Sequence, residues 1–469
     1  MLEIIKNEWK GLLRNRLILL LFAFCMAVTV WVTLLGQWAA DHKDRLHEHA
    51  TAHMREQWDG MGDSNPHNAV HFGTYAFKPY GFLSSIDEGV QAVTGNVIRL
   101  EGHVQNEMAY SDASRSLAVS HFGKLKPALL LQYLVPLLLI FTAFSSISGE
   151  REAGRLRLLL VQGLSLPKII FAKAIAIASL GWLLLTLMLA VFLMEQGPSM
   201  EQDEILRIVL LSISYSIFYA VLVLLTVCLS AWSKRSSASL STIMALWVVW
   251  VICLPIVAGG ISDELHPLPS RRTFKTAMEK DRHQGIDGHN PSGERRKAFT
   301  DSLLVAYGVD EASQLPINAD GLIMQADEEY GNRVWDKHFG NNRSILEKQK
   351  KVRRLIAVLD PFMSLQHLSM AFCGNDLYHS QDFQVQAETY RRDIIKTMNE
   401  KHAYGGSKTG DWSWKASESF FQSIPEFAYD RPRITSVIDQ YLIDMFNLLS
   451  WTILLVVLTV LYGPKLKFE

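Results

Sequence analysis

Histidine is the residue type in this sequence that is best suited to binding a metal ion or a proton. All fifteen histidines lie in two polar stretches, residues 39–126 and 262–440. His42, His49 and His53 are spaced at i, i+7 and i+11, so a continuous helix would place them on one face. Within this set, His49 and His53 have the i, i+4 spacing at which two imidazoles can share a metal ion. These three residues are the candidate metal ligands of the sequence.

The histidines allow two interpretations. The functional one is a site for a metal or a metal chelate, or a sensor of pH, and His47, His67 and His71 lie close by in the sequence. The other is a set of solvated histidines on the surface of a polar domain. We favour surface histidines, because neither a cysteine nor a spaced set of carboxylates completes a site. We therefore expect no resident metal.

No other group of residues forms a recognisable catalytic set. Asp320, Glu328 and Glu329 lie near one another, and a solvated helix face explains them. A Ser-His-Asp triad assembles in space rather than in order, so the sequence leaves that possibility open. The phosphate-binding pattern G-x-x-x-x-G-K-[ST] is missing, since the sole Gly-Lys pair, Gly123–Lys124, is followed by leucine. We expect no nucleotide hydrolysis and no cofactor in this chain.

Composition indicates a membrane protein. The mean hydropathy of the 469 residues is +0.11, but apolar runs alternate with long polar segments. A net charge of -1 gives no argument for nucleic acid as a partner. Of the four cysteines only Cys373 lies in a polar segment, so an internal disulfide framework is not expected. The first apolar run is too long for a cleavable signal peptide.

Six apolar runs are long enough to cross a bilayer, since a helix of about 22 residues is about 33 Å long. The second run is short and holds Gln132 and Pro136, so we expect it to begin before Pro127 and to kink at Pro136. Charged residues occur only near the ends of the runs, which argues against an ion-coupled carrier. The predicted spans are residues 17–38, 127–144, 172–194, 206–232, 240–261 and 441–462.

Residues 1–16 carry apolar side chains on one helical face and four basic residues, which is typical of a helix lying on the bilayer surface. The alternative is that they simply begin the first span. Lysine and arginine also collect in residues 145–171, in residues 233–239 and in the tail, residues 463–469. Positive flanks stay in the cytoplasm, so both termini are predicted to be cytoplasmic.

The same parity places residues 39–126, the short acidic loop 195–205 and residues 262–440 outside the cytoplasm. Residues 37–58 can continue the first span outward as a helix, and residues 344–358 and 383–401 show helical periodicity. Breaks are expected at Asn290–Pro291, Gly405–Gly406 and Pro432. We predict an all-α polytopic membrane protein with a large, mainly helical extracytoplasmic domain, in which the two insertions pack together.

The loop between the second and third predicted spans combines closely spaced apolar, glycine and charged residues. Residues 154–162 can form a short helix with Leu156, Leu159 and Leu160 on one side, and Gly163 can end it in a left-handed conformation. Glu150, Arg151 and Glu152 place alternating charge where a soluble partner could grip. From the residues alone, an ordinary cytoplasmic loop is the favoured interpretation.

Several stretches resemble a known family. The pattern SGEREAGRLRLLL, after the second span, resembles the coupling-helix region of ABC type-2 exporter permeases, and the amphipathic N-terminus resembles their elbow helix. The segments LPINADGLIMQADEEYGNRVWDKHFG, LDPFMSLQHLSMAFCGNDLYHSQDF and YRRDIIKTMN resemble a large domain of unknown function. That domain lies between the last two spans in one bacterial subgroup of these permeases.

The resemblance implies a half-transporter of the bacterial inner membrane with a large periplasmic domain. Two permease subunits, identical or related, would work with two separate ATPase subunits, and ATP and magnesium would bind only to those subunits. The coupling residues implied are Glu150, Arg151, Glu152, Gly154 and Arg155. One alternative is a mechanotransducer that acts on a periplasmic partner without moving cargo, and another is a membrane-anchored binding or enzyme domain.

Overall fold

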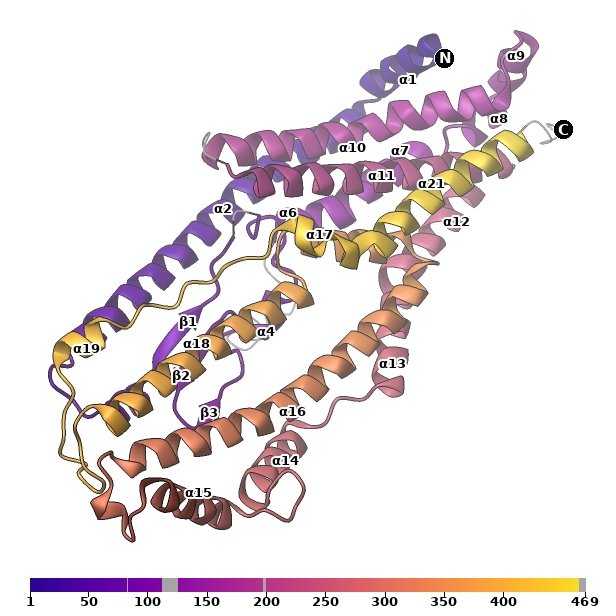
Figure 1. The fold of residues 1–469 in the computed structure, drawn as a ribbon. Coiled ribbons are helices and arrows are strands. Elements are labelled where there is room, and N and C mark those ends of the chain that lie inside the picture. The colour runs from indigo at the N-terminus through magenta and orange to yellow at the C-terminus, as the bar shows by residue number, and fades with distance from the viewer. Residues whose placement is uncertain (82, 112–124, 197–199, 464–469) are drawn as a thin grey trace.

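The computed structural model describes residues 1–81, 83–111, 125–196 and 200–463 of the chain. Its long apolar helices gather in a bundle, and a second body of helices extends from one end of that bundle (Figure 1). The N-terminus and the last described residue, Gly463, lie at the other end of the bundle. The basic tail residues Lys465 and Lys467 and the residues around Gly123–Lys124 lie outside the described ranges.

Among the described residues, six helices are long and apolar enough to span a membrane, which indicates a multi-pass membrane protein. The predicted number and order of spans are confirmed, and each helix is longer than the apolar run that predicted it. The candidate spans are Arg16–Asp59, Pro127–Glu152, Leu166–Met194, Gln202–Trp232, Ser236–Leu265 and Ile434–Tyr462. In Figure 1 their main elements are α2 (Arg16–Asp59), α7 (Val135–Ala143), α10 (Leu166–Gln196), α11 (Gln202–Trp232), α12 (Ser236–Val248), α13 (Leu254–Leu265) and α21 (Leu442–Tyr462).

The N-terminal segment is a separate helix, α1 (Leu2–Arg14), rather than the start of the first span. Asn15 has an extended backbone and its side chain accepts hydrogen bonds from the N–H groups of Leu17 and Ile18, which caps α2. Leu12 is buried, whereas Leu13 stays exposed. The helix therefore anchors to the bundle by one side, as an interfacial helix would.

Two of the spans contain a π-helical segment immediately before a proline. The second span begins at Pro127, so the expected earlier start is wrong, and it runs through α6 (Pro127–Leu129) and η2 (Leu130–Leu134) into α7. The fifth contains η3 (Val249–Cys253) ahead of α13. Pro136 and Pro255 have no N–H for the carbonyl four residues earlier, and the ladder shifts to wider bonding at that point.

The centre of the bundle is built by α7, α10 and α11. Tyr215, Phe218 and Tyr219 of α11 are fully buried. Gly181 of α10 lies against the Tyr219 ring, where an added Cβ would come within 2.8 Å of a ring carbon. This close approach requires glycine at that position. The spans formed by α2, by α12 to α13 and by α21 lie at the outside, where only 22%, 17% and 17% of their apolar windows are buried within the chain.

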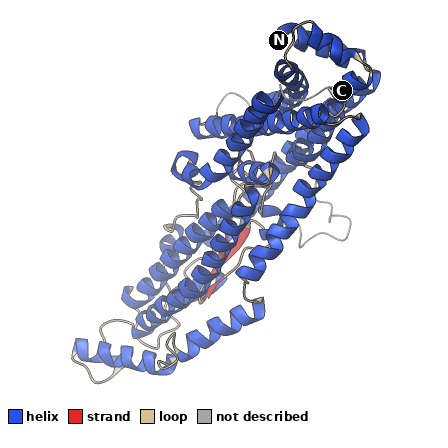
Figure 2. Ribbon diagram, turned by 90° about the vertical axis from the view of Figure 1, so that its right-hand side faces the viewer, coloured by secondary structure: helices blue, strands red, loops and turns tan. Residues whose placement is uncertain are grey.

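The second body is mainly helical with one small sheet, as predicted (Figure 2). The outer half of α2 continues the first span outward, and α16 and α18 contain the two stretches with helical periodicity. From the first insertion come α3 (Pro66–Phe72), β1 (Thr74–Phe77), α4 (Gln91–Thr94), β2 (Val97–Glu101) and β3 (Val104–Gln105). From the second come α14 (Arg271–Gln284), α15 (Ser292–Tyr307), η4 (Ala312–Gln314), α16 (Ala319–Ala357), α17 (Pro361–Phe372), α18 (Leu377–Tyr404), α19 (Glu418–Gln422), α20 (Ile434–Val437) and η5 (Ile438–Tyr441).

The two insertions share their apolar cores, as expected. One cluster joins Ala69 and Val70 of α3 to Met398 of α18, and another joins Ile98 of β2 to Phe383 of α18. The sheet has the order β1-β2-β3 and is antiparallel. Breaks between helices fall at each of the three predicted Gly and Pro positions.

Candidate functional site

The loop between the second and third spans folds into two short helices at the end of the bundle that carries the termini (Figure 1). These are α8 (Ser148–Glu152) and α9 (Arg155–Val161). Gly154 joins them with φ +71°, and Gly163 follows α9 with φ +83°. Left-handed backbone of this kind favours glycine, and this fixes both ends of α9.

One side of helix α9 packs against the bundle, and its other side is exposed. Leu156 is buried in the bundle core, and Leu159 and Leu160 are partly buried against the same core, as the sequence predicted. On the free side, Leu158 is 64% exposed and Val161 is 85% exposed. Two large apolar side chains this exposed at a helix tip form a surface suited to a partner.

Arg151 binds the end of the fourth span. Its Nη1 donates to the carbonyl of Ser233 at 2.5 Å and its Nη2 donates to the carbonyl of Ala231 at 2.7 Å. The last carbonyls of a helix have no partners within the helix, and their partial negative charge attracts a cation. The guanidinium therefore caps α11 with two charge-assisted hydrogen bonds.

Glu152 binds the start of the fifth span. Its Oε1 accepts from the N–H of Ser236 at 2.8 Å and its Oε2 accepts from the Ser236 hydroxyl at 2.9 Å. Ser148 adds a hydroxyl contact of 3.0 Å to Ser230 and another of 3.0 Å to Ser236. Helix α8 is thereby fastened to both sides of the turn between α11 and α12.

The hydrogen bonds of Arg151 and Glu152 to the α11–α12 turn form a clamp. The remaining predicted coupling residues lie beside it. The Nε of Arg155 donates to Glu150 at 2.6 Å, and Lys173 of α10 lies 3.9 Å from Glu150 and 2.6 Å from Glu8 of α1. All five predicted residues therefore gather in one place. Arg151 and Glu152 make hydrogen bonds within the chain, and Glu152 is also exposed, so contact of these charges with a partner stays a prediction. No local pattern indicated that the α11–α12 turn lies beside them.

A second cluster of contacts lies at the opposite end of α11. Arg207 is 1% exposed, and its Nη2 donates to the carbonyl of Pro432 at 2.6 Å while its Nε donates to Asp203 at 2.6 Å. Asp203 also accepts from the N–H of Ile434 at 2.6 Å. The i, i+4 spacing of Asp203 and Arg207 was the available sequence signal, and sequence reasoning missed it.

Helix α17 enters the bundle near this second cluster. Phe362, Leu365 and Leu368 are fully buried in the same core as the spans. Its Ser369 hydroxyl lies 3.0 Å from the hydroxyl of Tyr215 and donates to Asp87 of the first insertion at 2.5 Å. Burial raises the pKa of Asp87 above the usual range of an aspartate. Both insertions are thus fastened to the fourth span.

The polar residues of the spans serve two purposes. Gln132 donates to the Tyr215 hydroxyl at 3.0 Å, which joins the second span to the fourth. Ser212, Ser214 and Thr226 instead donate to carbonyls four residues back in their own helix.

The predicted histidine trio lies along the outward continuation of α2. His42 stacks on Trp38 with ring centroids 5.6 Å apart, His49 is exposed, and exposed His53 contacts Gln57 at 3.0 Å. Within the described ranges, the histidines that come together are a different set, namely His67, His71 and His103.

Comparison with known proteins identifies one region. Residues 271–430 match the family model described as a domain of unknown function, DUF3526. The matched region lies between the fifth and sixth candidate spans. No curated protein matches the chain.

Proposed function

We propose that this chain is the membrane-spanning permease subunit of an ATP-driven ABC transporter, working as an exporter in a bacterial inner membrane. Two copies, or this chain and a related permease, would pair across the bilayer. Two separate ATPase subunits would bind ATP and magnesium at the cytoplasmic side, where both termini lie in this proposal. The DUF3526 region would then be periplasmic.

One observation carries the proposal. The tip of α9 exposes Leu158 and Val161, while Arg151 and Glu152 fasten the adjacent α8 to the turn between two spans. A partner that pushes on the tip would displace that turn as well, since the connection through α8 is short and is held by the charge-assisted hydrogen bonds of Arg151 and Glu152. This arrangement suits the transfer of force from a soluble motor.

Helix α11 would carry the motion onward. It has 31 residues and is about 46 Å long. Arg151 binds its carbonyls at one end, and Arg207 at the other end binds the segment that leads into the sixth span. A displacement of the α11–α12 turn would therefore reach the outer domain and α17.

The test is capture of the ATPase. Wild-type chain purified from its native membrane should bring an ABC-type ATPase, identified by mass spectrometry, and should stimulate ATP hydrolysis after reconstitution. Leu158→Glu combined with Val161→Glu should insert and fold normally but lose capture. Val305→Glu is the matched control, because Val305 is 83% exposed in the outer domain. Failure of the wild type to bind any ATPase, or equal capture by the double variant, would refute the proposal.

Mechanical transmission without cargo is the second candidate, and the position of α17 favours it. Its buried face shares a core with α11, which includes the fully buried Phe218 and Tyr219. Spin labels on α11 and α17 would report their separation with and without a non-hydrolysable nucleotide on the ATPase. A separation that widens supports export, whereas a fixed separation with movement of the DUF3526 region supports transmission.

A further inference from the structure

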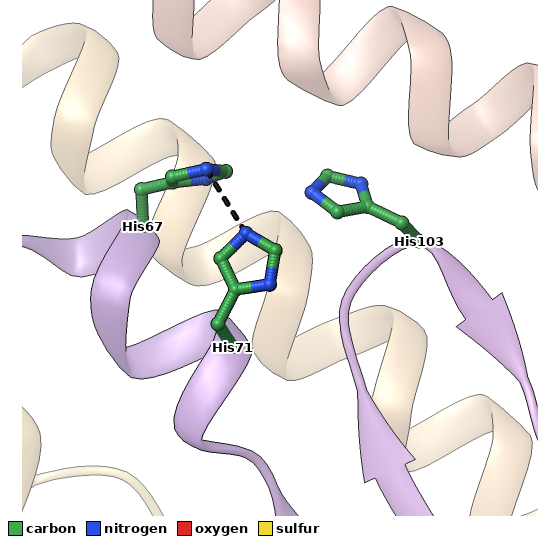
Figure 3. A group of neighbouring side chains, drawn as sticks. All are labelled: His67, His71 and His103. Atoms are coloured by element: carbon green, nitrogen blue, oxygen red, sulfur yellow. Dashed lines mark hydrogen bonds between the residues drawn. The ribbon is translucent and has the colours of Figure 1, made fainter.

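Three histidines converge at the seam between the two insertions, and none of them belongs to the predicted trio (Figure 3). His67 and His71 lie one turn apart on α3, with their Nε2 atoms 3.1 Å apart. His103, on the turn between β2 and β3, faces this pair, and its ring centroid is 5.1 Å from that of His71. One ring nitrogen from each residue lies within 4.8 Å of the other two.

The position of His103 is fixed from several directions. Its backbone has φ +65°, a left-handed conformation that is uncommon for a residue with a side chain. The carboxylate of Glu328, on α16, accepts a hydrogen bond from the backbone N–H of His103 at 2.7 Å and another from the Nδ1 of His103 at 2.6 Å. Arg282 donates to its carbonyl oxygen. Because Glu328 holds Nδ1, the Nε2 lone pair of His103 is free to face the other two rings.

Glu328 is built into the structure as a supporting group. Its side chain is 2% exposed, so the expectation of a solvated face is wrong for this residue. Arg391 lies 3.4 Å from its second oxygen and balances its charge. A carboxylate that binds the far nitrogen of a histidine is the usual support of a metal-ligating imidazole.

His67 is held in a partly buried position beside a cavity. The ring lies against Trp412, with centroids 5.4 Å apart. A cavity of about 380 Å³ opens beside His67 and His103, and its lining includes Asp327 and Trp412. The site therefore offers three imidazoles together with room for a water molecule.

We propose that His67, His71 and His103 bind one divalent transition-metal ion of the zinc type, with a water molecule from the cavity as fourth ligand. Three imidazoles with an open fourth position form a known zinc geometry. Tetrahedral ligands at 2.0–2.1 Å from a metal are about 3.3 Å apart, so small rotations of the rings would complete the site. Glu328 orients His103, and Trp412 packs on His67.

Such a site would join the two insertions. All three ligands belong to the first insertion, whereas Glu328 and Trp412 belong to the DUF3526 region. Metal binding would fix α3 and the β2–β3 turn against α16 and would stabilise the seam. This consequence does not depend on an ATPase partner, and its test is independent of the transport proposal.

The test uses full-length protein in detergent, purified through a tag without histidine and stripped of metal with a chelator. Zinc is then titrated against a chromophoric chelator, and the unfolding temperature is measured with and without zinc. We expect one tight equivalent and a higher unfolding temperature with the metal. Bound copper(II) should show nitrogen couplings from three imidazoles in its electron paramagnetic resonance spectrum.

Variants separate this site from adventitious binding. His71→Asn and His103→Asn should each lose the tight equivalent, and Glu328→Gln should weaken it by about 10–100-fold. His49→Asn combined with His53→Asn is the matched control, since it removes an exposed i, i+4 pair from α2 and should leave zinc binding unchanged.

Two outcomes would overturn the proposal. One is a wild-type protein without a tight equivalent, in which case the His67–His71 contact is an ordinary hydrogen bond between neutral rings. The other is tight binding that survives His71→Asn and His103→Asn but disappears with the α2 control. Size-exclusion profiles and zinc-free unfolding temperatures show whether each variant is folded.

Discussion

Arg151 offers the sharpest test of the clamp that it forms with Glu152 on the α11–α12 turn, because two replacements of Arg151 remove different parts of its contacts. Arg151→Ala removes both hydrogen bonds to the end of α11, whereas Arg151→Lys keeps a charge that can reach one carbonyl but not span both. A hydrogen bond to a charged group contributes about 1.5–3 kcal/mol. The side chain is only half-buried, so we halve that figure for each bond and expect alanine to cost about 1.5–3 kcal/mol locally.

This free energy predicts how often the α11–α12 turn opens. Since about 1.4 kcal/mol is a factor of ten, Arg151→Ala should raise the opening equilibrium by about 10–100-fold. Hydrogen exchange of peptides covering residues 231–240, measured in nanodiscs, should accelerate by that factor, with lysine giving an intermediate value. Under the proposed function, stimulation of the ATPase subunit should fall in the same order, and Glu150→Ala combined with Arg151→Ala should lower it at least as far.

The control is Arg157→Ala, which changes an exposed residue of α9 without touching the clamp. It should leave the exchange rates of residues 231–240 unchanged, even where it weakens ATPase binding. Unchanged exchange in Arg151→Ala would show that the clamp contributes no stability. Faster exchange with undiminished ATPase stimulation would show that force does not pass through it.

Two further predictions concern the outer domain. Arg207→Ala leaves the partly buried carboxylate of Asp203 without its guanidinium partner, so it should lower stability by about 1–3 kcal/mol and speed exchange around Pro432, as measured by denaturant unfolding and hydrogen exchange. Arg272→Ala, at an exposed position, should do neither. Burial lowers the pKa of His402. Below about pH 6.5 this histidine is therefore protonated in the unfolded chain before it is protonated in the folded protein. Stability should therefore fall as pH drops from about 7 to 5, and His402→Gln should show a smaller loss of unfolding temperature over that range. An equal loss in both proteins would contradict the assignment.

Features that depend on nearby residues could be predicted from the sequence. The six spans follow from the length of their apolar runs, and the ends of α9 follow from glycine at positions 154 and 163. The helices that contain residues 344–358 and 383–401 follow from their periodicity. In each case the backbone conformation is set by residues within a few positions along the chain.

Features that depend on distant residues could not be predicted. The partners of Arg151 are 80 and 82 residues away, and those of Glu152 are 84 residues away. His103 lies 225 residues from Glu328, which holds it in place. The i, i+4 pattern of His67 and His71 was visible, but it resembled that of His49 and His53. Only the fold shows which pair meets a third histidine.

Some helices of the bundle should resist bending more than others, and this difference bears on how the protein could move. Helix α11 is regular over its whole length, it is the most buried of the long helices together with the second span, and charged clamps hold both of its ends. The second and fifth spans each contain a π-helical segment followed by a proline, where the backbone ladder is already rearranged. Bending costs least where hydrogen bonds are already displaced. A push on α9 would therefore move α11 as a rigid body, and the change of shape would concentrate at η2 and η3. Because η3 packs against α17, the same bend would shift the helix that fastens the outer domain to the bundle.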